Sequence, residues 1–299
     1  MYSPTAHIGI FTSSYSVTKE SNMTVHHPSS SFPEYFRKLS TAYSRQTGDS
    51  TFNLIYSFLQ HLPADVTLNE QSIIHDNAAG PGTATIAAMS ILKREPAKIV
   101  VTDFTQGMID NIQARIDQEQ WRNITASVMD SHELEFPDDT FTLTICNVST
   151  STFKDPLKCM QEILRTLQPG GVCINSQWKR FTVKDIIHKA QISIRPDSKL
   201  FNMPKAEFLN DGVLRDLMLE AGFAKADQYV ETTIITDDAI EGLREFMCGN
   251  FTASARSGWT DEEAAKWPAA IDAAIEEEKA NSGGIKMEAW MVVAKKAGS

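Results

Sequence analysis

Three acidic side chains stand where they could bind a polar ligand. Asp76, Asp103 and Asp130 each follow a short run of mostly apolar residues. A carboxylate can accept hydrogen bonds from two ribose hydroxyl groups or from the amino group of a purine. Each run has the length of a buried strand, and open α/β sheets bind ligands at the carboxyl ends of their strands. The spacing predicts a nucleoside site, with Asp103 on the ribose and Asp130 at the base.

A turn of small residues, Ala78–Gly82, follows the first acid directly. Gly80 and Gly82 would let a ligand lie against the backbone, and the helix predicted after the turn would offer free N–H groups to an anion. The dinucleotide-binding pattern is incomplete, because Thr85 stands in place of the third glycine and Pro81 removes one donor. Taken alone, this stretch could be an ordinary strand–helix turn.

Strand and helix patterns alternate around these residues. Strands are predicted at 73–76, 99–103, 124–129, 141–147 and 172–175, with helical patterns between them. Such alternation predicts an α/β fold with a doubly wound, mostly parallel sheet. Two later strands, at 229–235 and 285–294, are expected to complete a seven-stranded, Rossmann-like sheet.

The rest of the chain is expected to cover this sheet. We predict a flexible arm over residues 1–30 and a single domain over 31–299. Helical patterns before the first strand would cover the ligand cleft, and they bring Tyr43 to it or into an aromatic core. Two cap segments, at about 179–210 and 238–284, would shape a substrate site.

The charge and composition of the chain limit the kinds of partner and compartment that we expect. The 299 residues carry a net charge of −10, which disfavours nucleic acid. No apolar run reaches the length of a membrane span, and we expect no secretion signal. The four cysteines are scattered and read as reduced thiols of a cytoplasmic protein. No metal-ligand spacing is recognisable, so no metal site is predicted. The sequence does not indicate an oligomeric state.

Taken together, the motifs resemble those of class I S-adenosylmethionine-dependent methyltransferases. The segment Asp76–Gly82 resembles that family's glycine-rich loop, with Ala78 in place of its usual first glycine. Asp103 and Asp130 match its ribose and adenine acids. Two later segments, 134–141 and 167–171, match further signatures. The resemblance is clear over about residues 50–178.

A narrower likeness is to fungal small-molecule methyltransferases of secondary metabolism, of the gliotoxin-type thiol class. It rests on Asp76–Ala78, on the run 102–108 and on Trp178.

The resemblance implies a cofactor, S-adenosyl-L-methionine, and a small-molecule substrate methylated on sulfur, oxygen or nitrogen. Phe104 could pack on the adenine ring, and Asn147 would face the crevice. The implied cofactor-binding residues are Tyr43, Asp76, Asn77, Ala78, Gly80, Gly82, Asp103, Phe104, Met108, Met129, Asp130, Ser131 and Asn147.

Catalysis leaves alternatives open. A thiol acceptor can react without a base, whereas a hydroxyl or ammonium group would need help in losing its proton. His188 is the candidate base; the alternative is a residue on a helix surface. His132 is expected in a surface loop. The protein could also bind the cofactor in a regulatory or non-methylating role, because fold does not settle function. A nicotinamide dehydrogenase and a nucleic-acid methyltransferase are less consistent with the motifs and the charge.

Overall fold

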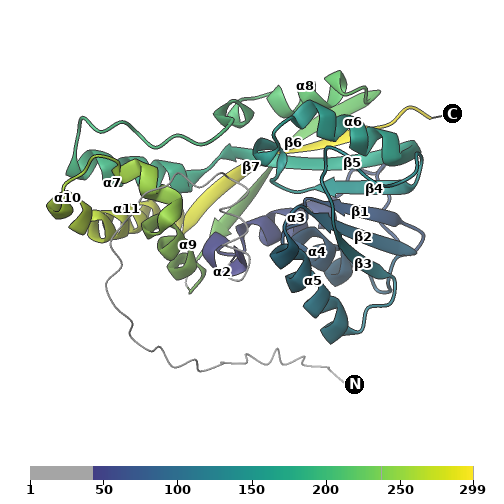
Figure 1. Ribbon diagram of the computed structural model, residues 1–299, viewed down its shortest axis with the longest axis horizontal. Coiled ribbons are helices and arrows are strands. Elements are labelled where there is room, and N and C mark those ends of the chain that lie inside the picture. The colour runs from purple at the N-terminus through teal and green to yellow at the C-terminus, as the bar shows by residue number, and fades with distance from the viewer. Residues whose placement is uncertain (1–42, 237, 299) are drawn as a thin grey trace. The chain divides into compact units, whose positions relative to one another are not determined.

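The structure is a computed structural model that describes residues 43–236 and 238–298 (Figure 1). The predicted arm, residues 1–30, lies outside the described residues. Two helical patterns were expected before the first strand. The first is described only from Tyr43, which begins α2 (Tyr43–Thr47). The second is α3 (Ser50–Gln60).

A seven-stranded sheet forms the centre of the fold, in the order β3-β2-β1-β4-β5-β7-β6. Its strands are β1 (Ile73–Asn77), β2 (Lys98–Asp103), β3 (Ile124–Val128), β4 (Phe141–Cys146), β5 (Leu167–Arg180), β6 (Lys225–Ile235) and β7 (Ile285–Lys295). The first five are parallel, and β7 runs antiparallel between β5 and β6. The predicted seven-stranded, mostly parallel sheet is confirmed.

Strand β2 shows why these segments become central strands. Ile99 and Val101 belong to the hydrophobic cluster on one face, and Val100 belongs to the cluster on the other. Successive side chains of a strand point to opposite faces, so a run of β-branched residues suits a sheet covered on both sides.

Helices cover both faces of the sheet (Figure 1). On one face lie α3, α4 (Thr83–Ile91) and α5 (Gln106–Glu119); on the other lie α6 (Pro156–Thr166) and α8 (Val213–Glu220). Asp155 caps α6 as predicted, because its carboxylate accepts the N–H of Lys158 at 3.0 Å. Thr105 precedes α5 but its side chain does not cap it; the carboxylate of Asp103 accepts the Thr105 N–H instead.

The C-terminal part adds helices beyond the ends of β5, β6 and β7 (Figure 1). They are α7 (Thr182–Ile194), α9 (Asp238–Cys248), η4 (Asn250–Arg256), α10 (Asp261–Ala265) and α11 (Trp267–Ser282). The short helix η3 (Ala206–Leu209) lies instead over the sheet, where Phe208 belongs to the same buried cluster as Leu214 of α8. Thr260 and Glu263 form a capping box at the start of α10. The helix does not continue unbroken into α11, because Pro268 has no N–H to extend α10 and instead lies in the first turn of α11.

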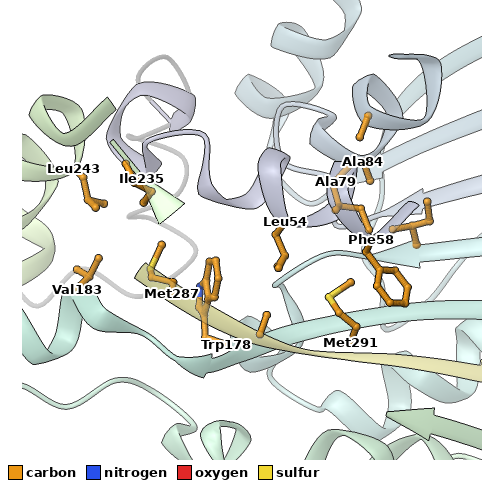
Figure 2. Packing of buried hydrophobic residues seen from close by; sticks show 14 of the residues in the cluster. Leu54, Phe58, Ala79, Ala84, Trp178, Val183, Ile235, Leu243, Met287 and Met291 are labelled. Atoms are coloured by element: carbon orange, nitrogen blue, oxygen red, sulfur yellow. The ribbon is translucent and has the colours of Figure 1, made fainter. Parts of the chain in front are cut away.

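One buried cluster joins these helices to the sheet. Figure 2 shows Val183 of α7 and Leu243 of α9 near Met287 of β7, with Leu54 of α3 farther along the same cluster. Trp178, expected after the fifth strand, lies within β5, which is longer than predicted because it pairs with β7 as far as Arg180.

Candidate functional site

A cavity of about 740 Å³ lies at the carboxyl ends of the central strands. Its walls come from the turns that follow β1, β2, β3 and β4, from α2 and from the loop before η3. The predicted residues that line it are Tyr43, Ala78, Gly80, Asp103, Phe104, Met108, Asp130, Ser131 and Asn147. These predicted residues come from five separate segments of the chain, and they meet at one cavity.

The turn after β1 brings the backbone to the cavity at Gly80. Its φ is +57°, and a side chain there would project to within 4.0 Å of Tyr43. Gly82 serves a different purpose, because a Cβ on it would lie 2.4 Å from Ile112. Gly82 therefore lets the start of α4 pack on α5, and it does not line the cavity. Ala78, where the family pattern has glycine, has a φ of +50°, which is costly for a residue with a side chain.

Asp103, at the end of β2, is held in place by backbone groups. Its two carboxylate oxygens accept the N–H of Gly80 at 2.9 Å and the N–H of Thr105 at 2.8 Å. Burial raises the pKa of this carboxyl group, although both hydrogen bonds act in the opposite direction. Each oxygen keeps a lone pair for a further donor such as a ribose hydroxyl.

Asp130, after β3, is half exposed and paired with His132. One of its oxygens accepts the backbone N–H of His132 at 2.9 Å and lies 2.6 Å from His132 Nδ1. Partial burial raises the pKa of Asp130, but these hydrogen bonds outweigh it and the net pKa lies below the ordinary value. His132 Nε2 accepts the N–H of Asp155 at 3.1 Å, so the imidazole fastens this loop to the start of α6.

Phe104 presents an exposed aromatic face at the cavity wall. It follows Asp103 directly, and half of its surface (51%) is accessible. A large apolar side chain exposed at a cavity suits a planar ligand group. Met108, one turn into α5, lies behind it in the wall and is buried.

Four predicted cofactor residues do not line the cavity. Asp76 is buried and accepts both the N–H and the hydroxyl of Thr85, at 2.9 and 2.7 Å. Burial raises its pKa to about 7, and its other oxygen has no hydrogen-bond partner within the described residues. Asn77 is buried and accepts the hydroxyl of Ser131 at 3.0 Å. The N–H of Met129 donates to the carbonyl of Asp103 in β2, and Gly82 packs against Ile112 of α5. These four residues therefore support the residues that line the cavity and do not line it themselves.

Tyr43 and Asn147 close the cavity on the side of α2 and α3. Burial and the nearby charge of Asp103 raise the pKa of Tyr43 to about 12, so its hydroxyl stays protonated at neutral pH. The amide of Asn147 donates to the carbonyl of Thr51 at 3.0 Å and accepts the hydroxyl of Ser176 at 2.7 Å. Both ends of that amide are used, which fixes its orientation.

The structure does not support His188 as a base. His188 lies on α7, does not line the cavity, and its Nε2 donates to the carbonyl of Phe201 at 2.6 Å. We therefore assign it a role in joining α7 to the following loop. In the described residues no cluster of metal-ligating side chains is found, and no helix is long and apolar enough to span a membrane.

Other lining residues were not predicted. Lys154 and Lys158 flank the start of α6, and Pro204 and Lys205 come from the loop before η3. His132 was expected on the surface, yet it lines the cavity. The polar turn after β4, which was expected at the crevice from Asn147 onward, also contributes Ser149 and Ser151. Nothing local to the lysines reveals that they meet.

The comparisons agree with this geometry. Residues 76–175, which contain all three strand-end acids, match the family described as methyltransferase domain. This match, the seven-stranded sheet and the cavity together support a class I S-adenosylmethionine-dependent methyltransferase domain in this part of the chain. The cavity residues after β1 to β4 fall inside or at the edge of the matched segment. Two carboxylates, an exposed phenyl ring and an open glycine backbone also suit an adenosyl group chemically.

Relatives of this chain include fungal proteins that are named methyltransferases. It is 28% identical over 180 residues to the methyltransferase tpcH of Aspergillus fumigatus, which covers 58% of this chain and 64% of that protein. It is 29% identical over 204 residues to the methyltransferase ucsB of an Acremonium species, covering 64% of this chain and 69% of that protein. The matched region is thus just under two thirds of the first relative's length.

A solved structure shares the fold. It is a phosphoethanolamine N-methyltransferase of Haemonchus contortus in complex with phosphomonomethylethanolamine and S-adenosylhomocysteine. The TM-score is 0.54 at 17% identity, over 88% of this chain and 58% of the other.

Proposed function

We propose that this methyltransferase transfers a methyl group from S-adenosylmethionine to a heteroatom of a small molecule, in fungal secondary metabolism. The observation that carries the proposal is the position of Asp103, whose carboxylate lies in the cavity beside the Gly80 backbone. The names and fungal sources of tpcH and ucsB support the metabolic setting. A cavity of this size suits a small molecule better than a polymer.

The residues divide the binding task. Asp103 would accept the ribose hydroxyls, Asp130 would accept the adenine amino group, and Phe104 would cover the ring. Tyr43 and the Gly80 backbone would enclose the other end. When bound, S-adenosylmethionine supplies a methyl group already activated by a sulfonium. The protein then has mainly to align the acceptor and to exclude water.

The two predicted cap segments, 179–210 and 238–284, would have different roles. Pro204 and Lys205 of segment 179–210 line the cavity, whereas the described lining includes no residue of segment 238–284. We assign substrate contact to the first segment. The second would support α2, which packs on α9 where Gly242 approaches the carbonyl of Arg45.

Incubation with S-adenosylmethionine labelled on its methyl group tests the proposal. The full chain is mixed with a fungal metabolite extract, and labelled products are separated by chromatography. We expect label in one or a few low-mass products, and less of it with the Asp103→Ala variant when the cofactor is below saturation. Cofactor binding without labelled product would favour the regulatory or non-methylating role.

A further inference from the structure

Three lysines line one part of the cavity. Lys154 precedes α6, Lys158 lies in its first turn, and Lys205 comes from the loop before η3. The Lys205 Nζ donates to the carbonyl of Lys154 at 3.4 Å, so the two loops are joined. Lys205 also has a φ of +49°, a conformation rare for a residue with a side chain and often found at functional sites.

Ion pairs with acidic side chains are common among the described lysines outside the cavity. Eight lysines elsewhere form ion pairs, for example Lys179 with Glu288 and Lys296 with Asp139. In the part of the chain that the structure describes, Lys154, Lys158 and Lys205 form none. In the cavity wall these three lysines outnumber the two carboxylates, Asp103 and Asp130, although the protein has a net charge of −10. Lys158 is near enough to Asp130 for its charge to help lower the pKa of that carboxyl group. Such a group of lysines attracts an anion.

The described cavity wall also offers no group poised to remove a proton. Both nitrogens of His132 are engaged, by Asp130 and by the N–H of Asp155. Asp103 is held by two backbone N–H groups. The Tyr43 hydroxyl stays protonated at neutral pH. Within the described wall these groups are engaged, so an acceptor that is already ionised needs the least help from the protein.

We propose that the methyl acceptor is an oxyanion, the ionised form of an acidic phenol, enol or carboxylic acid, and that Lys154, Lys158 and Lys205 select it. This inference rests on the proposed methyltransferase function. Ammonium groups are strong donors to anionic oxygen and stabilise the ionised form of the acceptor. They would repel an amine acceptor, which is a cation at neutral pH.

The transfer balances without a base. The acceptor oxygen uses a lone pair to form a bond to the methyl carbon, while the bond from that carbon to sulfur breaks. The electron pair of the broken bond stays on sulfur. An oxyanion and a sulfonium thus give a neutral methyl ether or ester and a neutral thioether, and no proton is released in this step. The proton leaves the acceptor earlier, to water, when it ionises.

A matched pair of ligands tests the charge preference. Protein saturated with S-adenosylhomocysteine is titrated in a calorimeter with 2-naphthoate and with 2-naphthamide, which have nearly the same shape but differ in charge. We expect naphthoate to bind at least about tenfold more tightly, a difference of about 1.4 kcal/mol, because its carboxylate would be attracted by the lysine ammonium groups. The preference should weaken as salt is added.

Variants assign the effect to the lysines. Changing Lys154, Lys158 and Lys205 together to glutamine should abolish the preference, and changing them to arginine should retain it. Lys98→Gln, at the opposite end of β2, is the matched control and should bind as the unmodified protein does. All variants should keep their melting temperature and their affinity for S-adenosylhomocysteine.

Several outcomes overturn the oxyanion inference alone. These are equal binding of the two ligands, absence of naphthoate binding at millimolar concentration, or a preference that survives in the triple glutamine variant. In each case binding of S-adenosylhomocysteine leaves the methyltransferase proposal standing. A protein that does not bind S-adenosylhomocysteine would contradict the proposed function first, and the oxyanion inference with it.

Discussion

The backbone N–H of Gly80 lies 2.9 Å from a carboxylate oxygen of Asp103. This hydrogen bond joins the turn after β1 to the end of β2, and both residues line the cavity. The part of the turn that would approach the ligand and the side chain that would bind its ribose are thereby fixed to one another before any ligand arrives. Such pre-organisation lowers the entropy that binding must overcome.

Replacing Asp103 should therefore weaken cofactor binding. We expect Asp103→Ala to lose about 1–3 kcal/mol of binding free energy, because hydrogen bonds to a charged group are lost. Asp103→Asn should lose less, since its amide oxygen can still accept one N–H. Asp110→Ala, an exposed change on α5, is the control and should bind normally. Calorimetry with S-adenosylhomocysteine measures all three; equal affinities would remove Asp103 from the site.

Replacing Ala78 by glycine should stabilise the protein. Ala78 has a φ of +50°, and relief of this strain outweighs the added flexibility of the unfolded chain. We expect the free energy of unfolding to rise by up to about 1 kcal/mol. Ala87→Gly, in the middle of α4, should do the opposite because it loosens a helix. Urea denaturation compares the two, and a clear loss of stability in Ala78→Gly would contradict this view of the turn.

Gly242 should position Tyr43 from a distance. A Cβ on Gly242 would lie 1.9 Å from the carbonyl oxygen of Arg45, so any side chain there must displace α2. The ion pair of Arg45 with Glu245 joins the same two helices. We expect Gly242→Ala to weaken S-adenosylhomocysteine binding severalfold while the sheet stays folded.

A double-mutant cycle separates this role from general damage. If Gly242 acts through Tyr43, Gly242→Ala should have little further effect on binding in a Tyr43→Ala protein. Additive losses of binding free energy would show that the two residues act independently, and the positioning role would then be abandoned.

The strands and their acidic ends could be predicted because their signals are local. The aliphatic run before Asp103 forms a strand when it is buried, and the residue that follows the run must lie at the carboxyl end of that strand. The hydrogen bond between Lys205 and the carbonyl of Lys154 could not be predicted, since it depends on how the loop before η3 returns to the start of α6. The two histidines were misplaced for the same reason. His132 was expected on the surface but lines the cavity, and His188 was the candidate base but does not line it. Tertiary contacts, and not neighbours in sequence, decide which imidazole lies at the cavity.

Asp76 should make stability depend on pH. Burial raises its pKa to about 7, well above that of the unfolded chain. Between these two values the folded protein holds a proton that the unfolded chain releases, so the free energy of unfolding falls as pH rises, by at most about 1.4 kcal/mol per pH unit. Asp76→Asn lacks this titration and can still accept the N–H of Thr85. Urea denaturation at pH 5 and pH 7 should show a smaller difference in the variant; identical differences would contradict the buried, protonated carboxyl.

The most direct measurement is calorimetric titration of the full chain with S-adenosylhomocysteine. The account predicts saturable binding of one ligand per chain, competed by S-adenosylmethionine and weakened by Asp103→Ala but not by Asp110→Ala. Two results would contradict the central claim that this cavity holds the adenosyl cofactor. One is absence of binding at millimolar ligand. The other is an affinity that is the same in the unmodified protein, in Asp103→Ala and in Asp110→Ala.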